Sequence, residues 1–308
     1  MDLMIKQMRH ESQDVLSLVL VDPDGSALPA WRPGAHIDLD LDGNLRQYSL
    51  CGDPADQYSY RIGVHRAVES RGGSAYLHDV LRPGHLVTVT GPRNHFELDE
   101  SPAYLFIAGG IGITPILPMI ACAEEQGSCW RLVYGGRSLS TMAFLDQLSA
   151  YGDHVQLVPQ DHEGLIDLES LLGKLLEDTL VYACGPEPLL VAAEERCSSW
   201  PSRSLHVERF AAKVQDVGDD SAFEVVCLAS DQTVKVLPGV SIVDALEEVD
   251  IWIPSACREG ICGTCETAVI EGTPDHRDSL LTDEERASGK CMMTCVSRSL
   301  SSRLVLDI

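Results

Sequence analysis

The sequence predicts three domains: an antiparallel β-barrel, an α/β domain with a parallel sheet, and a smaller C-terminal unit. In the first hundred residues, short apolar runs alternate with turn signals, and from Tyr104 onward apolar runs alternate with helical patterns. The 308 residues also exceed one ordinary core, since domains of about 100 to 150 residues are commonest. We expect domains at 1–101, 102–212 and 222–308, with a linker at 213–221.

The first domain is predicted from evenly spaced β-type runs. These runs lie at residues 15–21, 36–41, 46–50 and 58–64, with turn residues between them. Short strands with this spacing are typical of an antiparallel barrel or sandwich.

The second domain is predicted from a change of periodicity. Apolar runs at 104–108, 131–134, 155–158 and 180–183 alternate with helical patterns at 115–126, 142–150, 168–176 and 187–197. This alternation indicates a parallel sheet with covering helices. The uncharged stretch 103–123 contains three glycines and two prolines, which favours a strand and turn over a membrane-spanning helix.

The composition limits the possible partners and the compartment. A net charge of -24 argues against binding to nucleic acid or to an anionic membrane, which both call for basic patches. No export signal is evident at Met1, so the eleven cysteines are expected to be reduced thiols and metal ligands in a cytoplasmic protein.

The most specific motif is a set of cysteines near the C-terminus. Cys257, Cys262 and Cys265 have C-x4-C-x2-C spacing, and Cys295 follows after 29 residues, which is the plant-type [2Fe-2S] spacing. The alternatives are a set of buried structural cysteines and a structural zinc site, but zinc sites usually present two compact pairs. Cys291 competes as the fourth ligand, and the interval favours Cys295.

Two short motifs in the first domain suggest a phosphate site. Arg46-Gln47-Tyr48-Ser49 ends a strand, and Gly72-Gly73-Ser74 precedes a helix-like segment. Glycines and a serine at a helix start offer N–H groups and a hydroxyl to an anion, to which Arg46 would add a charge-assisted contact. Taken alone, a strand-ending arginine and tyrosine are usually ordinary surface residues, and a Gly-Gly-Ser turn is more often just a turn.

Two turns in the second domain suggest a nucleotide site. The run from Gly109 and Gly110 through Gly112 to Thr114 and Pro115 follows an apolar strand and opens a helix, although it is not the G-x-G-x-x-G fingerprint. Cys184-Gly185-Pro186 follows a second apolar strand. The alternatives are a plain strand-to-helix turn and a buried small residue.

The stretches SACREGICGTC (255–265), DHRD (275–278) and MTCVS (293–297) resemble the C-terminal ferredoxin domain of the phthalate dioxygenase reductase family, which includes vanillate O-demethylase reductases. The resemblance covers essentially the whole chain. It implies a multidomain fold: an antiparallel β-barrel flavin domain, an α/β parallel-sheet nicotinamide domain and an α+β β-grasp-like ferredoxin domain.

The resemblance also implies cofactors and residue roles. FMN would bind with Arg46 at its phosphate, Tyr48 on its isoalloxazine and Ser49 near N5. Cys184 would lie beside the site of hydride transfer, and Phe210 would stack on the flavin until the nicotinamide displaces it. The implied nucleotide is NADH, although Arg137 leaves NADPH open. The remaining implied cofactor-binding residues are Val64, Gly72, Gly73, Ser74, Gly109, Gly110, Gly112, Thr114, Pro115, Gly185 and Pro186.

We therefore predict an enzyme that carries electrons from NADH through FMN and a [2Fe-2S] cluster to a Rieske-type terminal oxygenase of aromatic catabolism, and that acts as a monomer. A flavin is needed because a nicotinamide gives two electrons together and a cluster accepts one. The alternatives are a reductase for a diiron or P450 monooxygenase and, in another class, a non-enzymatic iron-sulfur carrier or redox sensor. Residues 222–308 hold 15 acidic and 7 basic residues, so we expect an oxygenase with a basic face.

Overall fold

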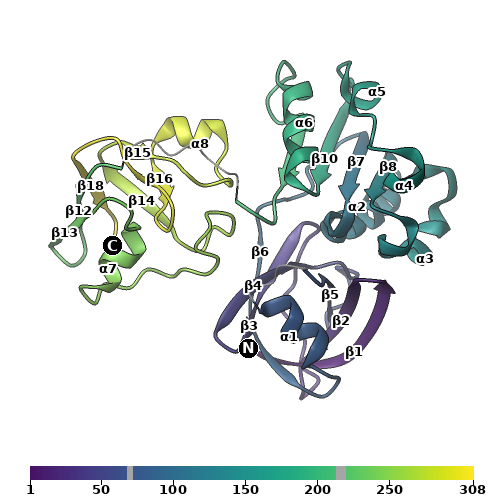
Figure 1. Cartoon of the computed structure of the whole chain (residues 1–308), viewed down its shortest axis with the longest axis horizontal. Coiled ribbons are helices and arrows are strands. Elements are labelled where there is room, and N and C mark those ends of the chain that lie inside the picture. The colour runs from purple at the N-terminus through teal and green to yellow at the C-terminus, as the bar shows by residue number, and fades with distance from the viewer. Residues whose placement is uncertain (68–71, 213–219) are drawn as a thin grey trace. The chain divides into compact units, whose positions relative to one another are not determined.

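The computed structural model describes residues 1–67, 72–212 and 220–308, which form two compact units, Met1–Arg209 and Phe210–Ile308 (Figure 1). The first unit holds an antiparallel and a parallel sheet, and the second holds a mixed sheet. The domain boundaries stay predictions, and residues 213–219 of the predicted linker lie outside the described residues. None of the helices in the described parts of the chain has the length and apolar character of a membrane span.

The antiparallel sheet of the first unit closes into a barrel. Its strands lie in the order β4-β3-β6-β1-β2-β5, and a bridge from Leu50, directly after β4, to Ile62 of β5 joins the two outer strands. The elements are β1 (Asp2–Ser12), β2 (Val15–Val21), β3 (Ala35–Leu41), β4 (Asn44–Ser49), β5 (Tyr60–His65), α1 (Gly73–Asp79) and β6 (Leu86–Asn94). The sequence prediction lacks β1 and β6. Few of their residues face the core, as in β1, where only Leu3 and Ile5 are buried.

Five parallel strands form the second sheet, in the order β11-β10-β7-β8-β9. Its strands are β7 (Ala103–Gly109), β8 (Cys129–Gly136), β9 (Val155–Pro159), β10 (Thr179–Cys184) and β11 (Leu205–Glu208). Its helices are η1 (Gly110–Gly112), α2 (Ile113–Gln126), η2 (Leu139–Thr141), α3 (Leu145–Leu148), η3 (Ser149–His154), α4 (Gln160–Glu163), α5 (Leu168–Leu172) and α6 (Glu187–Cys197).

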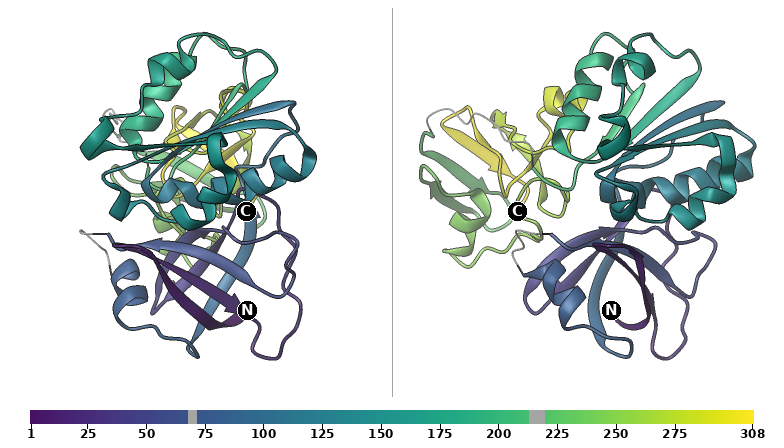
Figure 2. Two further views of the ribbon diagram at one scale, coloured as in Figure 1. Left: turned by 90° about the vertical axis from the view of Figure 1, so that its right-hand side faces the viewer. Right: turned by 45° about the vertical axis from the view of Figure 1, so that its right-hand side comes forward.

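Apolar side chains cover both faces of the parallel sheet. Phe106 packs in one cluster with residues of α2, and Ile107, its neighbour on β7, packs in another with residues of α5 and α6. Figure 2 shows helices on both sides of this sheet. The alternation follows from the two-residue period of a strand. The helix predicted at 142–150 is shorter than expected: α3 has four residues and continues as 3-10 turns. The helix predicted at 168–176 ends at Leu172, where Gly173 caps it, because glycine is a poor helix former.

Barrel and parallel sheet contact each other within the first unit. Gly63 of β5 lies against Thr114 and Phe144, since a Cβ built at Gly63 would be 2.7 Å from Thr114 Cγ2. The Arg61 guanidinium lies 4.8 Å from the centre of the Phe144 ring and donates to Gln147 Oε1 at 3.1 Å. These contacts hold the carboxyl end of β7 beside the barrel.

The second unit is a five-stranded mixed sheet packed against one helix. The strand order is β13-β12-β18-β14-β16, with β12 and β18 parallel and the other pairs antiparallel. The elements are β12 (Phe223–Cys227), β13 (Gln232–Val236), α7 (Ile242–Glu247), β14 (Glu266–Glu271), β15 (Pro274–Asp275), α8 (Asp283–Ser288), β16 (Cys291–Met293), β17 (Arg298–Ser299) and β18 (Arg303–Leu306). Ile242 and Leu246 of α7 are fully buried in the same core as Met292 and Leu304. A mixed sheet covered by a helix agrees with the predicted α+β, β-grasp-like domain.

Candidate cofactor and electron-transfer sites

The two glycine-containing turns of the parallel sheet meet at one point. Strands β7 and β10 are neighbours, and the chain leaves β7 toward β8 and β10 toward β11, so the strand order reverses between them. A Cβ built at Gly109 would lie 2.6 Å from Pro186 Cδ, and one at Gly112 would lie 2.3 Å from the Cys184 carbonyl oxygen. Ligands of open α/β sheets bind at such a reversal, outside the carboxyl ends of the strands.

Cys184 has a carboxylate partner that the sequence prediction does not include. Cys184 on β10 and Glu208 on β11 are paired in register, and their Sγ and Oε2 atoms lie 3.9 Å apart. Burial raises the pKa of Glu208 to about 8, and burial together with Glu208 raises the pKa of the Cys184 thiol. At neutral pH this pair is therefore a neutral thiol beside a carboxyl group that is largely protonated. In the sequence, the feature that could have identified Glu208 as a site residue is its position at the end of an apolar strand.

Other predicted nucleotide residues lie around the same strand ends. Thr114 is buried in the first turn of α2, together with Pro115, and donates to the Ile111 carbonyl at 3.0 Å. Arg137 is exposed after β8, and its carbonyl accepts from Asp161 N at 3.1 Å. Burial lowers the pKa of His65 at the end of β5, and Arg137 adds to the lowering, so Arg137 lies near the barrel edge.

The two motifs predicted to hold a flavin phosphate also come together. Arg46 lies over the start of α1, since a Cβ built at Gly73 would be 2.8 Å from Arg46 Cγ. Gly72 caps that helix with φ +100, a conformation that favours glycine. Ser74 Oγ accepts from Ala67 N at 3.3 Å. A guanidinium stem, a glycine turn and a hydroxyl therefore gather at one edge of the barrel.

The remaining flavin residues differ in accessibility. Tyr48 is half-buried, and burial raises the pKa of its hydroxyl although Arg46 opposes the shift. Ser49 is 4% exposed. Val64 is fully buried in the barrel core, so its prediction as a flavin contact rests on the resemblance alone.

Phe210 is the first residue of the second unit, and its side chain is 42% exposed. Directly before it, Arg209 forms two ion pairs with α6: its Nε donates to Glu187 at 3.0 Å and its Nη2 donates to Glu194 at 2.6 Å. Only 6% of the Arg209 side chain is exposed. This clamp, which the sequence prediction lacks, fixes the chain directly after Glu208.

The four cysteines with plant-type spacing converge in the second unit. Hydrogen bonds from Cys262 and Cys295 lower the pKa of Cys257, and a hydrogen bond from Cys295 lowers the pKa of Cys265. The four sulfurs are therefore neighbours. Backbone amides also turn toward them: Glu259 N donates to the Cys257 sulfur at 3.3 Å. Four converging thiols with backbone donors fit a [2Fe-2S] cluster, which takes four thiolates.

Glycine and a buried carboxylate shape the loop that carries three of these cysteines. Gly260 has φ +69, and a Cβ there would lie 2.6 Å from Val296 Cγ2 and 3.0 Å from Asp278 Cα. Ser279 N donates to the Gly260 carbonyl at 2.9 Å. The fully buried Asp278 carboxylate accepts from Arg286 at 3.1 Å. The loop is thus packed tightly between the DHRD segment and the segment of Cys295.

Cys291 occupies a different environment. It lies on β16 opposite Ala268 of β14. Burial and the charge of Glu266 are the largest causes that raise its pKa, whereas the Cys295 thiol is hydrogen-bonded to Cys257 and Cys265. This placement supports the prediction that Cys295 is the fourth ligand.

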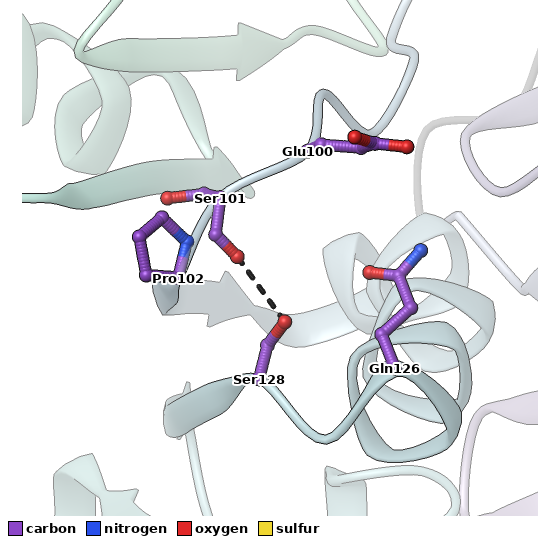
Figure 3. A pocket seen from close by; sticks show the side chains of 5 residues that line it. All are labelled: Glu100, Ser101, Pro102, Gln126 and Ser128. Carbon is purple, nitrogen blue, oxygen red and sulfur yellow. Dashed lines mark hydrogen bonds between the residues drawn. The ribbon is translucent and has the colours of Figure 1, made fainter.

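A shallow hollow of about 430 Å³ lies at the opposite end of the parallel sheet (Figure 3). Glu100, Ser101, Pro102, Gln126 and Ser128 line it, and Ser128 Oγ donates to the Ser101 carbonyl at 3.1 Å. These residues adjoin the amino ends of β7 and β8. None of them belongs to the predicted sites.

Comparisons with known proteins agree with this geometry. A family model described as a 2Fe-2S iron-sulfur cluster binding domain matches residues 226–300. The beta subunit of a phenoxybenzoate dioxygenase from Ectopseudomonas oleovorans is 44% identical over 310 residues, covering 99% of this chain and 97% of the relative. An intact type IV self-sufficient cytochrome P450 monooxygenase matches the whole chain with 42% identity and a TM-score of 0.94, and the chain covers 41% of that protein.

A phthalate dioxygenase reductase, described as a modular structure for electron transfer from pyridine nucleotides to [2Fe-2S], is 34% identical with a TM-score of 0.73. The match covers 100% of this chain and 98% of that protein. The fold predicted from the sequence is confirmed, and the predicted FMN, NADH and [2Fe-2S] cluster are the cofactors of this fold. By identity over its full length, this chain belongs to the phthalate dioxygenase reductase family.

Proposed function

We propose that this protein is the NADH-dependent reductase component of a Rieske-type oxygenase system and that it acts as a monomer. The observation that carries the proposal is the presence of three sites on one chain: the reversal point between β7 and β10, the Arg46–Gly73 edge of the barrel, and the four converging cysteines. FMN would convert the hydride of NADH into the single electrons that a cluster accepts.

The residues at the strand ends and at the barrel edge would bind the two cofactors and present an uncharged surface to the nicotinamide. Gly109 and Gly112 let the turn after β7 approach the turn after β10, with which a side chain would collide. A pyrophosphate would bind beside these turns, at the start of α2. Cys184 and Glu208 would present a neutral surface to a nicotinamide, because neither group carries full charge in this buried pair. Arg46 and the Gly72-Gly73-Ser74 turn would hold the flavin phosphate.

Cofactor analysis tests the first half of the proposal. The isolated protein should contain one FMN, two irons and two labile sulfides per chain, since the described residues include one flavin-phosphate turn and one four-thiolate site. Released flavin that chromatographs as FAD would contradict the flavin assignment. Stoichiometric zinc without labile sulfide would contradict the cluster.

Redox chemistry and similarity to a dioxygenase subunit support a Rieske oxygenase as the partner. Plant-type clusters lie near about -400 mV and Rieske centres at about -150 to +300 mV, so transfer to a Rieske centre is downhill by roughly 250 mV or more. At about 59 mV per decade for one electron, this is at least about four decades of equilibrium drive. Anaerobic mixing of the NADH-reduced protein with purified Rieske oxygenases should bleach a Rieske spectrum within the catalytic time.

A P450 partner is the second candidate, because the self-sufficient P450 contains a segment that matches this whole chain. The same anaerobic experiment separates the two. The Rieske proposal predicts faster reduction of a Rieske centre than of any P450 haem at equal concentration. The reverse order of rates would favour the P450 assignment.

A further inference from the structure

We infer that the exposed indole of Trp252 anchors this chain to its terminal oxygenase, in an apolar pocket with a basic rim on that partner. The inference rests on the proposed function and names the surface through which this chain would bind the oxygenase. We call Glu248, Val249, Asp250 and Trp252 the Trp252 surface.

The exposure of Trp252 is imposed by its neighbours. Its side chain is 73% exposed, whereas Trp31 and Trp130 are 8% and 6% exposed and Trp200 is half-buried. Ile253 is buried in the core of the second unit, and Ile251 packs against the same core. With both neighbours directed inward, the indole is held outward. Tryptophan is enriched at protein interfaces relative to the rest of the surface, so an indole that the fold holds in water favours a binding role.

The segment that carries Trp252 is tethered at both ends. It begins directly after α7 and leads to Arg258. The Arg258 guanidinium returns to that helix and contacts Asp244 at 2.7 Å and Glu247 at 2.6 Å. Because the indole is mounted on a closed loop, little conformational freedom remains to be lost when a partner binds.

The segment that carries Trp252 leads directly into the loop of the cluster site. Cys257 is half-buried, whereas Cys262 and Cys265 are each 1% exposed and Cys295 is 7% exposed. Solvent therefore reaches the thiolate site at Cys257. Trp252 precedes Cys257 by five residues, so their Cα atoms are within about 18 Å even if the chain is fully extended. A partner bound on Trp252 would therefore contact the chain within about 18 Å of Cys257, where an electron can leave.

Charge identifies the kind of partner. Glu248 and Asp250 are exposed, and in the described parts of the chain neither forms an ion pair. Residues 1–209 hold 29 acidic and 15 basic residues, a net charge of -14. The chain's own first unit therefore repels this rim on average, whereas a separate protein with Lys and Arg around a pocket complements it. Tryptophan is enriched among the residues that dominate binding energy at such interfaces.

The test uses full-length, cofactor-loaded protein and the oxygenase component of a phenoxybenzoate dioxygenase. Two quantities are measured: the Kd of the complex by titration calorimetry, and the second-order rate of Rieske reduction. Trp252→Ala should raise Kd and lower the rate by about tenfold or more, as expected for a central aromatic anchor. Trp252→Phe should stay within about threefold. Glu248→Gln with Asp250→Asn should lower the rate at low salt and flatten its salt dependence.

Leu300→Ala is the matched control, because Leu300 lies in the same unit and is also 73% exposed. Its Kd and rate should change less than about twofold, as is usual for surface side chains outside the centre of an interface. Equal effects of the two alanine variants would overturn the inference.

A second measurement tests whether Trp252 binds the first unit of its own chain instead of the oxygenase. Reduction of the cluster by NADH without oxygenase should proceed at the wild-type rate in Trp252→Ala. If this internal transfer slows while Kd is unchanged, Trp252 binds the chain's own first unit and the inference is wrong. If the wild-type chain neither binds nor reduces this or any other Rieske oxygenase, the proposed function itself fails.

Discussion

Substitution of Gly112 by alanine tests whether the two turns of the nucleotide site are packed as closely as the structure indicates. Gly112 has φ -60 and ψ -5, which any residue adopts, so alanine there adds no backbone strain. Its Cβ would lie 2.3 Å from the Cys184 carbonyl oxygen, 2.5 Å from the Cys184 carbonyl carbon and 2.7 Å from Gly185 N. The effect would therefore be purely steric.

The magnitude follows from these distances. Real Cβ contacts are essentially never closer than 3.0 Å, so the ends of β7 and β10 must separate by about 0.7 Å, and the obstacle is backbone rather than a flexible side chain. Overpacking of this kind costs about 1 to 3 kcal/mol. For a folding unit of about 200 residues, a cost of about 2 kcal/mol lowers Tm by about 4 to 8 °C. A shift approaching 1 Å at a binding site can cost up to about a hundredfold in activity, so we expect the KM for NADH to rise at least about tenfold.

Calorimetry and NADH-ferricyanide kinetics measure both effects. Gly127→Ala is the control: Gly127 ends α2 with φ +69 and open space around it, so alanine should cost about 1 kcal/mol and leave the KM unchanged. If Gly112→Ala matched the wild type in both Tm and KM, the close approach of the two turns at the nucleotide site would be refuted.

Three further predictions concern single side chains. Cys295→Ser should abolish the visible and EPR signals of the cluster while Cys291→Ser retains them, and both should keep NADH-dependent flavin reduction; the opposite pattern would identify Cys291 as the ligand. Gly260→Ala should prevent cluster assembly, measured as labile sulfide, because of the 2.6 Å contact with Val296, whereas Gly239→Ala in open space should not. Burial raises the pKa of Glu208 from 4.5 to about 8, so the stability of the first unit should fall as pH rises through this window. Urea titrations should show a weaker pH dependence for Glu208→Gln, and an unchanged slope would count against the burial of this carboxyl.

The sequence by itself determined the local features. The spacing of Cys257, Cys262, Cys265 and Cys295 indicates a plant-type cluster, because ligand spacing along one loop is a local property. Alternation of apolar residues and the placement of glycines likewise identified β2 and α6 with their observed bounds, since strand and helix periods are read directly from neighbouring residues.

Only the tertiary structure decided which distant segments meet. The pairing of Cys184 with Glu208, the clamp of Arg209 on Glu187, and the outward position of Trp252 each depend on contacts between separate elements. No local pattern encodes them, because burial of a carboxyl or exposure of an indole is set by what packs around it. For the same reason β1, which buries only two residues but pairs with both β2 and β6, gave no apolar signal and yet lies between them in the barrel.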